Sequence, residues 1–92
     1  MARVELTRHL FQFFPALDGQ ELNVDGTTVA EIVAGLEALA PGIAFYICDE
    51  RGQLRRHVNV FVDEQSVRDR GRLSDPVQPD SSIFIAQALS GG

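Results

Sequence analysis

The stretch TVAEIVAGLEALA, residues 28–40, has the spacing of an amphipathic helix, with apolar side chains on one stripe at Val29, Ile32, Val33, Leu36 and Leu39. Thr28 and Glu31 have the spacing of a capping box, in which the hydroxyl and the carboxylate each bind an otherwise unpaired backbone N–H. Pro41 and Gly42 supply the stop signal. Gly35 costs the helix about 1 kcal/mol relative to alanine. The helix therefore depends on packing against another layer.

Strand-like alternation surrounds this helix. Residues 57–62 alternate most regularly, with three valines on one face and His57, Asn59 and Phe61 on the other. Residues 2–7 and 21–24 are expected to pair as a hairpin, and residues 82–86 form a last strand. Residues 43–56 are first apolar and then turn-like, and they fit no single assignment.

This order of elements predicts an α+β domain with four or five strands and one helix across one face of the sheet. The expected core consists of the inward-facing apolar residues of these elements: Val4, Leu6, Leu22, Val24, Val29, Ile32, Val33, Leu36, Val58, Val60, Val62, Ile83 and Ile85.

The size and charge of the chain exclude several classes of protein. Its 92 residues, 45% hydrophobic and 23% charged, suffice for one domain and leave no room for a second core. A net charge of −5 disfavours nucleic acid as a partner. The apolar runs are far shorter than the roughly 20 residues of a membrane-spanning helix. Residues 1–6 do not have the pattern of a secretory signal, so we expect a cytoplasmic protein that does not act on membranes.

Side chains that could carry chemistry are few. His9 and His57 have no companions at metal-ligand spacing, so no metal site is expected. Cys48 is expected to be structural, because Asp49 and Glu50 raise the pKa of its thiol and only Arg51 opposes them. The arginines at 55, 56, 68, 70 and 72 are interpreted as a surface neutralised by nearby carboxylates, namely Asp63, Glu64, Asp69 and Asp75.

The sequence ends on Gly91-Gly92. A pair of glycines at this place has a chance of about 0.005 if each position is glycine about 7% of the time. Beyond Ala86, an extended chain reaches up to roughly 20 Å from the fold. Because neither glycine carries a side chain, the terminal carboxylate is able to thread a narrow channel in another protein.

The chain resembles the ubiquitin-like sulfur carriers of the MoaD/ThiS type. The resemblance rests on the hairpin, the helix at 28–40, the segment VNVFVD at 58–63, the segment DSSIFI at 80–85 and the terminal Gly91-Gly92. Residues 54–62 with Val67-Arg68 look most like the CysO-type carriers that feed cysteine synthesis. Two departures are Pro79-Asp80, where a Gly-Asp pair is usual, and a tail with less proline.

The resemblance implies a β-grasp fold over residues 1–86 and a flexible tail over residues 87–92. It implies that an E1-like enzyme adenylates the Gly92 carboxylate with ATP and that a thiocarboxylate then forms there, with Gly91 needed for delivery of the tail. The chain itself is expected to bind no cofactor and to be a carrier, not an enzyme. Partner-binding residues are expected at Phe61, Phe84, Leu89 and Ser90.

The expected acceptor is a serine-derived intermediate on a pyridoxal-phosphate cysteine synthase. Alternatives are the small subunit of molybdopterin synthase, or a carrier of sulfur for thiamin or a secondary metabolite. A protein modifier is an alternative of another class, and because the chain has no lysine, it cannot form lysine-linked chains on itself. A β-grasp interaction module with an accidental Gly-Gly is a third class.

Overall fold

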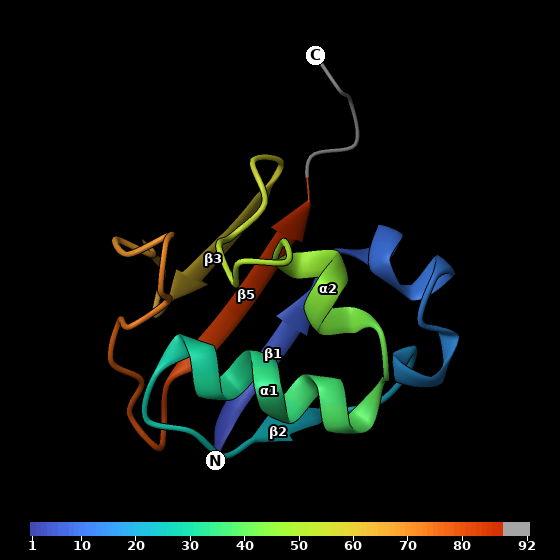
Figure 1. Cartoon of the computed structure of the whole chain (residues 1–92). Helices are drawn as coiled ribbons and strands as arrows, with labels where there is room; N and C mark the ends of the chain where they lie inside the picture. Colours follow the sequence, from blue (N-terminus) through green and yellow to red (C-terminus); the bar gives the residue numbers. More distant parts are fainter. Residues whose placement is uncertain (88–92) are drawn as a thin grey trace.

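The computed structural model of the chain describes residues 1–87 and consists of a mixed sheet with helices on one side (Figure 1). The sheet has five strands in the order β2-β1-β5-β3-β4. Their bounds are β1 Ala2–Leu6, β2 Leu22–Val24, β3 Val58–Val62, β4 Gln65–Ser66 and β5 Ser82–Gln87. The expected α+β architecture with a four- to five-stranded sheet is confirmed.

Strand β5 lies in the middle of the sheet. It pairs in parallel with β1, where Glu5 is opposite Phe84, and antiparallel with β3, where Phe61 is opposite the same Phe84. Strands β1 and β2 form the expected antiparallel pair. Strand β5 also includes Gln87, one residue beyond the expected end of the last strand.

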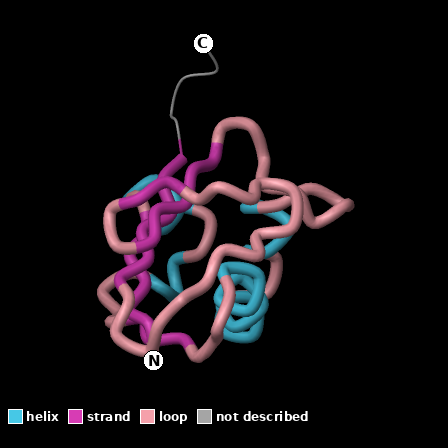
Figure 2. The backbone as a smooth tube through the Cα atoms, turned by 90° about the vertical axis from the view of Figure 1, so that its left-hand side faces the viewer, coloured by secondary structure: helices cyan, strands magenta, loops and turns pink. Residues whose placement is uncertain are grey.

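Helix α1, Val29–Leu39, covers the core face of the sheet, and Figure 2 shows the strands on one side and this helix on the other. Four positions of its predicted apolar stripe are buried, but Leu39 is 52% exposed, so its assignment to the stripe is wrong. Leu39 is the last residue of the helix, where the chain turns away toward Pro41.

The predicted capping box is half formed. The Glu31 N–H donates to Thr28 Oγ1 at 3.3 Å, as expected. The Glu31 carboxylate, however, accepts from the backbone N–H of Thr27 at 2.7 Å and from the Thr27 hydroxyl at 3.1 Å. Glu31 therefore caps the residue before the N-cap, because Thr27 offers two donors at one place.

Residues 43–56 form a short helix and a turn. Helix α2, Ile43–Ile47, begins after Gly42, whose φ of 102° is open to glycine at little cost. Ile43 and Ile47 are buried, and a bridge between Cys48 and Leu54 closes the turn that follows.

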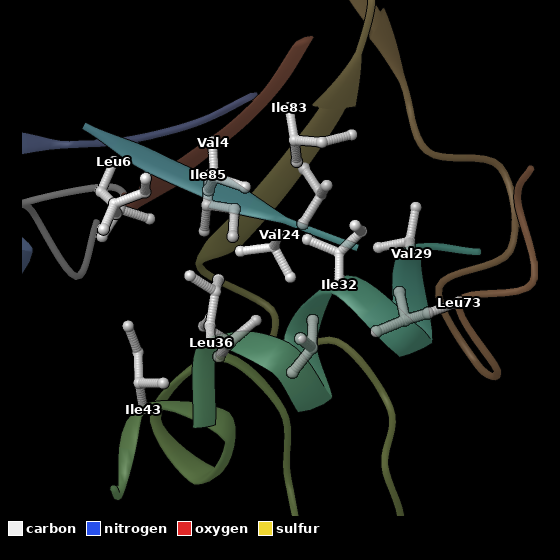
Figure 3. Close-up of a cluster of buried hydrophobic side chains, with 14 of the residues drawn as sticks. Val4, Leu6, Val24, Val29, Ile32, Leu36, Ile43, Leu73, Ile83 and Ile85 are labelled. Atoms are coloured by element: carbon white, nitrogen blue, oxygen red, sulfur yellow. The ribbon is translucent and has the colours of Figure 1, made fainter. Parts of the chain in front are cut away.

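The expected core is confirmed except at Val62, which is half-buried at the end of β3. Figure 3 shows side chains of β1, β5 and α1 meeting between the two layers, with Ile43 at one end and Leu73 at the other. Further buried residues that the strand and helix patterns did not predict come from helix α2 and from the segments between the strands and the longer helix: Leu10, Leu17, Ile43, Ile47, Cys48, Leu54, Val67, Leu73 and Val77.

Asp63 and Glu64 form the two-residue turn between β3 and β4. Both have positive φ, 49° and 71°, which matches the twist of the flanking strands. The Asp63 carboxylate accepts from the Ser81 hydroxyl at 3.0 Å and from the Ser82 N–H at 2.9 Å. The turn is thereby attached to the start of β5. Within residues 1–87, no helix has the length and apolar character needed to cross a membrane.

Candidate functional site

The face of the sheet opposite the helices carries an aromatic pair. Phe61 and Phe84 are direct cross-strand neighbours, with ring centroids 6.2 Å apart and ring planes 25° apart. Phe84 is 40% exposed, and Phe61 is half-buried. The sequence pattern placed Phe61 opposite the valines of β3 and placed Ile83 and Ile85 in the core. Both placements are confirmed because the period of two holds along β3 and β5.

Carboxylates border this exposed aromatic pair. A shallow hollow of about 520 Å³ is lined by the two rings together with Glu5, Glu64 and Ser82. Glu5 lies beside Phe84 in the register and forms an exposed ion pair with Arg3 at 3.6 Å. The face therefore combines an apolar centre with an acidic margin, which suits contact with a protein surface better than contact with phosphate.

Strand β5 leads to the end of the chain, and its last described residues are held on both sides. Ala86 and Gln87 lie opposite Asn59 and Val58 of β3. On the β1 side, the Thr7 hydroxyl accepts from the Gln87 N–H at 3.0 Å and donates to the Ile85 carbonyl at 3.1 Å. The expected site residues Gly91 and Gly92, and the expected partner contacts Leu89 and Ser90, lie outside the described residues.

Arg70 supports the same end of the sheet from the β3 side. Its guanidinium donates to the carbonyls of Arg55 and Val58 at 2.7 and 2.9 Å and to Asn59 Oδ1 at 2.9 Å. Asn59 is opposite Ala86, so Arg70 fixes the strand residues that pair with the end of β5. Neither Thr7 nor Arg70 has a sequence signal for this role, because the contacts join positions far apart in the chain.

In the described part of the chain, the arginine group and its neighbouring carboxylates are not joined by direct ion pairs. Within residues 1–87, none of the arginines at 55, 56, 68, 70 and 72 forms an ion pair with a carboxylate. Asp69 and Asp75 instead accept hydrogen bonds from backbone N–H groups, Asp75 from those of Arg68 and Asp69. These carboxylates shape the loop between β4 and β5, where backbone donors would otherwise be unpaired.

Cys48 is a buried structural residue, as expected, with 7% of its surface exposed. Burial is the main cause that raises the pKa of its thiol, and the charge of Asp49 adds to it. The opposing cation is Arg55 and not the expected Arg51, because the chain folds back after Gly52. A thiol with a raised pKa is a poor nucleophile at neutral pH.

His9 packs edge-on against Phe13, with ring centroids 5.4 Å apart, and His57 is exposed. Among residues 1–87, no group of three or more histidine, cysteine, aspartate and glutamate side chains is arranged to hold a metal ion.

The sheet order, the parallel pairing of β1 with β5 and the single long helix define a ubiquitin-like β-grasp protein. The ThiS family model matches residues 8–92, and the chain belongs to the ThiS family. This confirms the resemblance to MoaD/ThiS-type carriers. The chain is also 32% identical over 81 residues to the sulfur carrier protein CysO of Mycobacterium tuberculosis, an alignment covering 85% of this chain and 87% of that protein.

Solved structures agree with this assignment. The structure of the BexX/CysO complex from Amycolatopsis orientalis matches with a TM-score of 0.84 and 28% identity, covering 100% of both chains. Mycobacterium tuberculosis CysO matches with a TM-score of 0.82 and 28% identity, covering 97% of this chain and 100% of that one. The small archaeal modifier protein 1 from Methanosarcina acetivorans, with a TM-score of 0.77, 21% identity and coverage of 99% and 95%, shares the fold.

Proposed function

We propose that this protein is a sulfur carrier of cysteine biosynthesis and that its working group is the carboxylate of Gly92. The observation that carries the proposal is the family match, which extends through residue 92 and so includes Gly91-Gly92. The identity to proteins described as sulfur carrier CysO supports the same function. On this account the chain is a co-substrate of cytoplasmic partner enzymes and not itself an enzyme.

The proposed chemistry needs an activated carboxylate. An oxygen of the Gly92 carboxylate attacks the α-phosphorus of ATP on an E1-like partner, and pyrophosphate leaves. A hydrosulfide ion from the sulfur source then attacks the carbonyl carbon, AMP leaves and the S–H proton is lost, so a thiocarboxylate remains on Gly92. Activation is needed because carboxylate oxygen is a poor leaving group and adenylate is a good one. ATP therefore belongs to the partner, and this chain supplies only the terminal carbon.

The proposed acceptor is an activated serine-derived intermediate on a cysteine synthase that uses pyridoxal phosphate. The thiocarboxylate sulfur attacks this intermediate and forms a thioester between Gly92 and the acceptor. Water then cleaves the carbon–sulfur bond of the thioester, which leaves the sulfur on the acceptor and restores the carboxylate of the carrier. The resemblance of residues 54–62 to CysO-type carriers and the identity to CysO favour this acceptor over molybdopterin or thiamin precursors. The matched structure in which a CysO is bound to BexX supports the idea that a carrier of this fold docks onto a second protein.

The exposed aromatic pair is the proposed docking surface for the activating enzyme, with Leu89 and Ser90 contacting the channel that receives the tail. The pair lies on the strands next to the chain end, since Phe84 is three residues before Gln87. A partner that binds Phe61 and Phe84 would therefore also be the partner that receives the C-terminal tail.

Intact-mass spectrometry tests the proposal. The protein is incubated with its cognate activating enzyme, ATP and a sulfur source, and the expected result is the exchange of one oxygen for one sulfur. Gly91→Val should remain folded and lose loading, because a branched side chain widens the tail and restricts its backbone. The proposal would be overturned if the mass of the wild-type protein stayed unchanged under conditions that load a known carrier.

A further inference from the structure

A shallow groove of about 620 Å³ lies on the helix side of the molecule, between α1 and the segment from Gly42 to Gly52. Its floor is apolar and includes the buried side chains of Val33, Cys48 and Leu73. Alanines at exposed positions 30 and 34 of α1 leave the groove open, because a methyl group fills little of it. Figure 1 shows α1 and α2 in front of the sheet, so the groove and the exposed aromatic pair are on opposite sides.

Phe45 forms an aromatic wall of this groove and is 60% exposed. Its position is fixed by Arg55, whose guanidinium carbon lies 4.8 Å from the ring centroid and whose Nε donates to the Phe45 carbonyl at 2.9 Å. Burial of a large exposed ring in an interface is favourable, and a ring that is already held in one orientation loses little conformational entropy on binding. The groove therefore has a preformed apolar anchor point.

Three carboxylates border the groove: Glu37, Asp49 and Glu50. Glu37 accepts from the backbone N–H groups of Gly42, at 2.9 and 3.1 Å, and Ala44, at 2.9 Å. These hydrogen bonds lower the pKa of Glu37 and keep the group ionised at neutral pH.

Asp49 is also fixed, because its Oδ1 accepts from the N–H groups of Arg51 and Gln53 at 2.9 and 3.0 Å. In the part of the chain from residue 1 to 87, no arginine forms an ion pair with any of the three groove carboxylates. The three groove carboxylates outnumber the guanidinium of Arg55, which lies against the Phe45 wall, so the border of the groove keeps an excess of negative charge.

We propose that this groove is a second docking site and that it binds a segment of a partner protein in which an apolar side chain is flanked by lysines or arginines. The apolar side chain would lie between Phe45 and Ala34, and the cations would lie against the fixed carboxylates. Charge complementarity selects a basic segment over an acidic one. Because the site is on the opposite side from Phe61 and Phe84, it is occupied independently of docking there and does not depend on the proposed sulfur chemistry.

Titration of the isotope-labelled full chain with three peptides, followed by NMR, tests this inference. The probes are amphipathic helical peptides of about twelve residues: one with a leucine stripe and lysines, one with the same leucines and glutamates, and one with lysines and serines in place of leucine. Only the first is expected to shift the amide signals of Ala34, Cys48 and Gly52. Added salt should weaken its binding because the carboxylate–lysine attraction is screened.

Ala34→Arg and Ala38→Arg are matched variants of the same helix, because both residues are exposed and only Ala34 lines the groove. Ala34→Arg fills the groove and offsets one of its three negative charges, so it should weaken binding of the lysine–leucine peptide by about tenfold or more. Ala38→Arg should change the affinity by less than about twofold. Glu50→Arg, in an exposed turn, replaces one of the three negative charges by a positive one, and so it tests the charge of the groove without altering the helix.

Three results would overturn the inference. The first is that no peptide shifts these amides, and the second is that the glutamate peptide binds as well as the lysine peptide. The third is that the same amides shift with protein concentration alone, which would make a second copy of the chain the occupant of the groove.

Discussion

The hydroxyl of Thr7 joins two backbone positions on either side of Ala86: it accepts from the Gln87 N–H at 3.0 Å and donates to the Ile85 carbonyl at 3.1 Å. The Thr7 N–H donates to the same carbonyl at 3.0 Å. Strand β1 thereby continues to hold β5 past its own last residue, Leu6. Thr7 is a positioning residue that holds Gln87, the last described residue of β5, in the sheet.

Thr7→Val keeps the shape of the side chain and removes these hydrogen bonds of the hydroxyl. The loss of a hydrogen bond of about 1 kcal/mol corresponds to roughly fivefold faster local opening. We expect that increase in hydrogen exchange at the Gln87 amide, with the exchange of the Val4 amide in the middle of β1 unchanged. Equal protection of Gln87 in the variant and the wild type would show that the hydroxyl does not hold this residue.

Phe61→Ala and Phe84→Ala test the exposed aromatic pair as a docking surface. Each should weaken binding to the activating enzyme by about 2 kcal/mol, or about thirtyfold. The control is Phe13→Ala, which truncates another exposed phenylalanine, 53% exposed and packed against Tyr46 away from the sheet face. Unchanged affinity in both sheet variants, measured by calorimetry, would place the docking surface elsewhere.

Gly35→Ala should destabilise the protein although alanine favours helices. A Cβ at Gly35 would overlap Cγ1 of Val24, where α1 packs on β2. Overpacking of this kind costs about 1–3 kcal/mol, which exceeds the gain of about 1 kcal/mol in helix propensity. Val24→Ala in the same chain should recover part of the loss in urea unfolding. A higher midpoint of urea unfolding for Gly35→Ala than for the wild type would refute the close contact between Gly35 and Val24.

Glu37→Gln should reduce stability at neutral pH and have less effect in acid. The pKa of Glu37 is lowered in the folded state, so its contribution is present above the unfolded value of about 4.3 and is lost as the pH falls through the folded value. Thermal unfolding of both proteins between neutral and acidic pH measures the difference. Glu21→Gln removes the same charge at an exposed position and is the matched control. If the difference in stability between the wild type and Glu37→Gln grew as the pH fell, the lowered pKa of Glu37 would not be the cause of its contribution.

The two elements that the sequence predicts most directly are those whose apolar period extends over many residues. Residues 57–62 and 28–40 satisfy this condition, and so β3, α1 and the facing of Phe61 follow from the pattern. Helix α2 has five residues, and an apolar run of that length is equally compatible with a buried strand. Strand β4 has two exposed residues and no apolar signal at all.

The candidate site was predictable only in part. The terminal glycines are visible in the sequence because they form a local motif. The facing of the two phenylalanines is visible because it follows from the alternation along each strand. Thr7 and Arg70 act through contacts with Gln87 and Asn59 that depend on the register of the strands, and no local pattern encodes this register. The pairing of Glu31 with Thr27 shows the same limit at shorter range.

The location of the sulfur tests the central claim most directly. Trypsin cleaves after arginine, and because the chain has no lysine and its last arginine is Arg72, residues 73–92 form one fragment that contains Gly92. Cys48 falls in a different fragment, residues 9–51.

Mass spectrometry of the digest after loading should show the exchange of one oxygen for one sulfur in fragment 73–92 and an unchanged fragment 9–51. Fragmentation of the loaded peptide should assign the sulfur to Gly92. Sulfur found in fragment 9–51, or at any residue of 73–92 other than Gly92, would contradict the account.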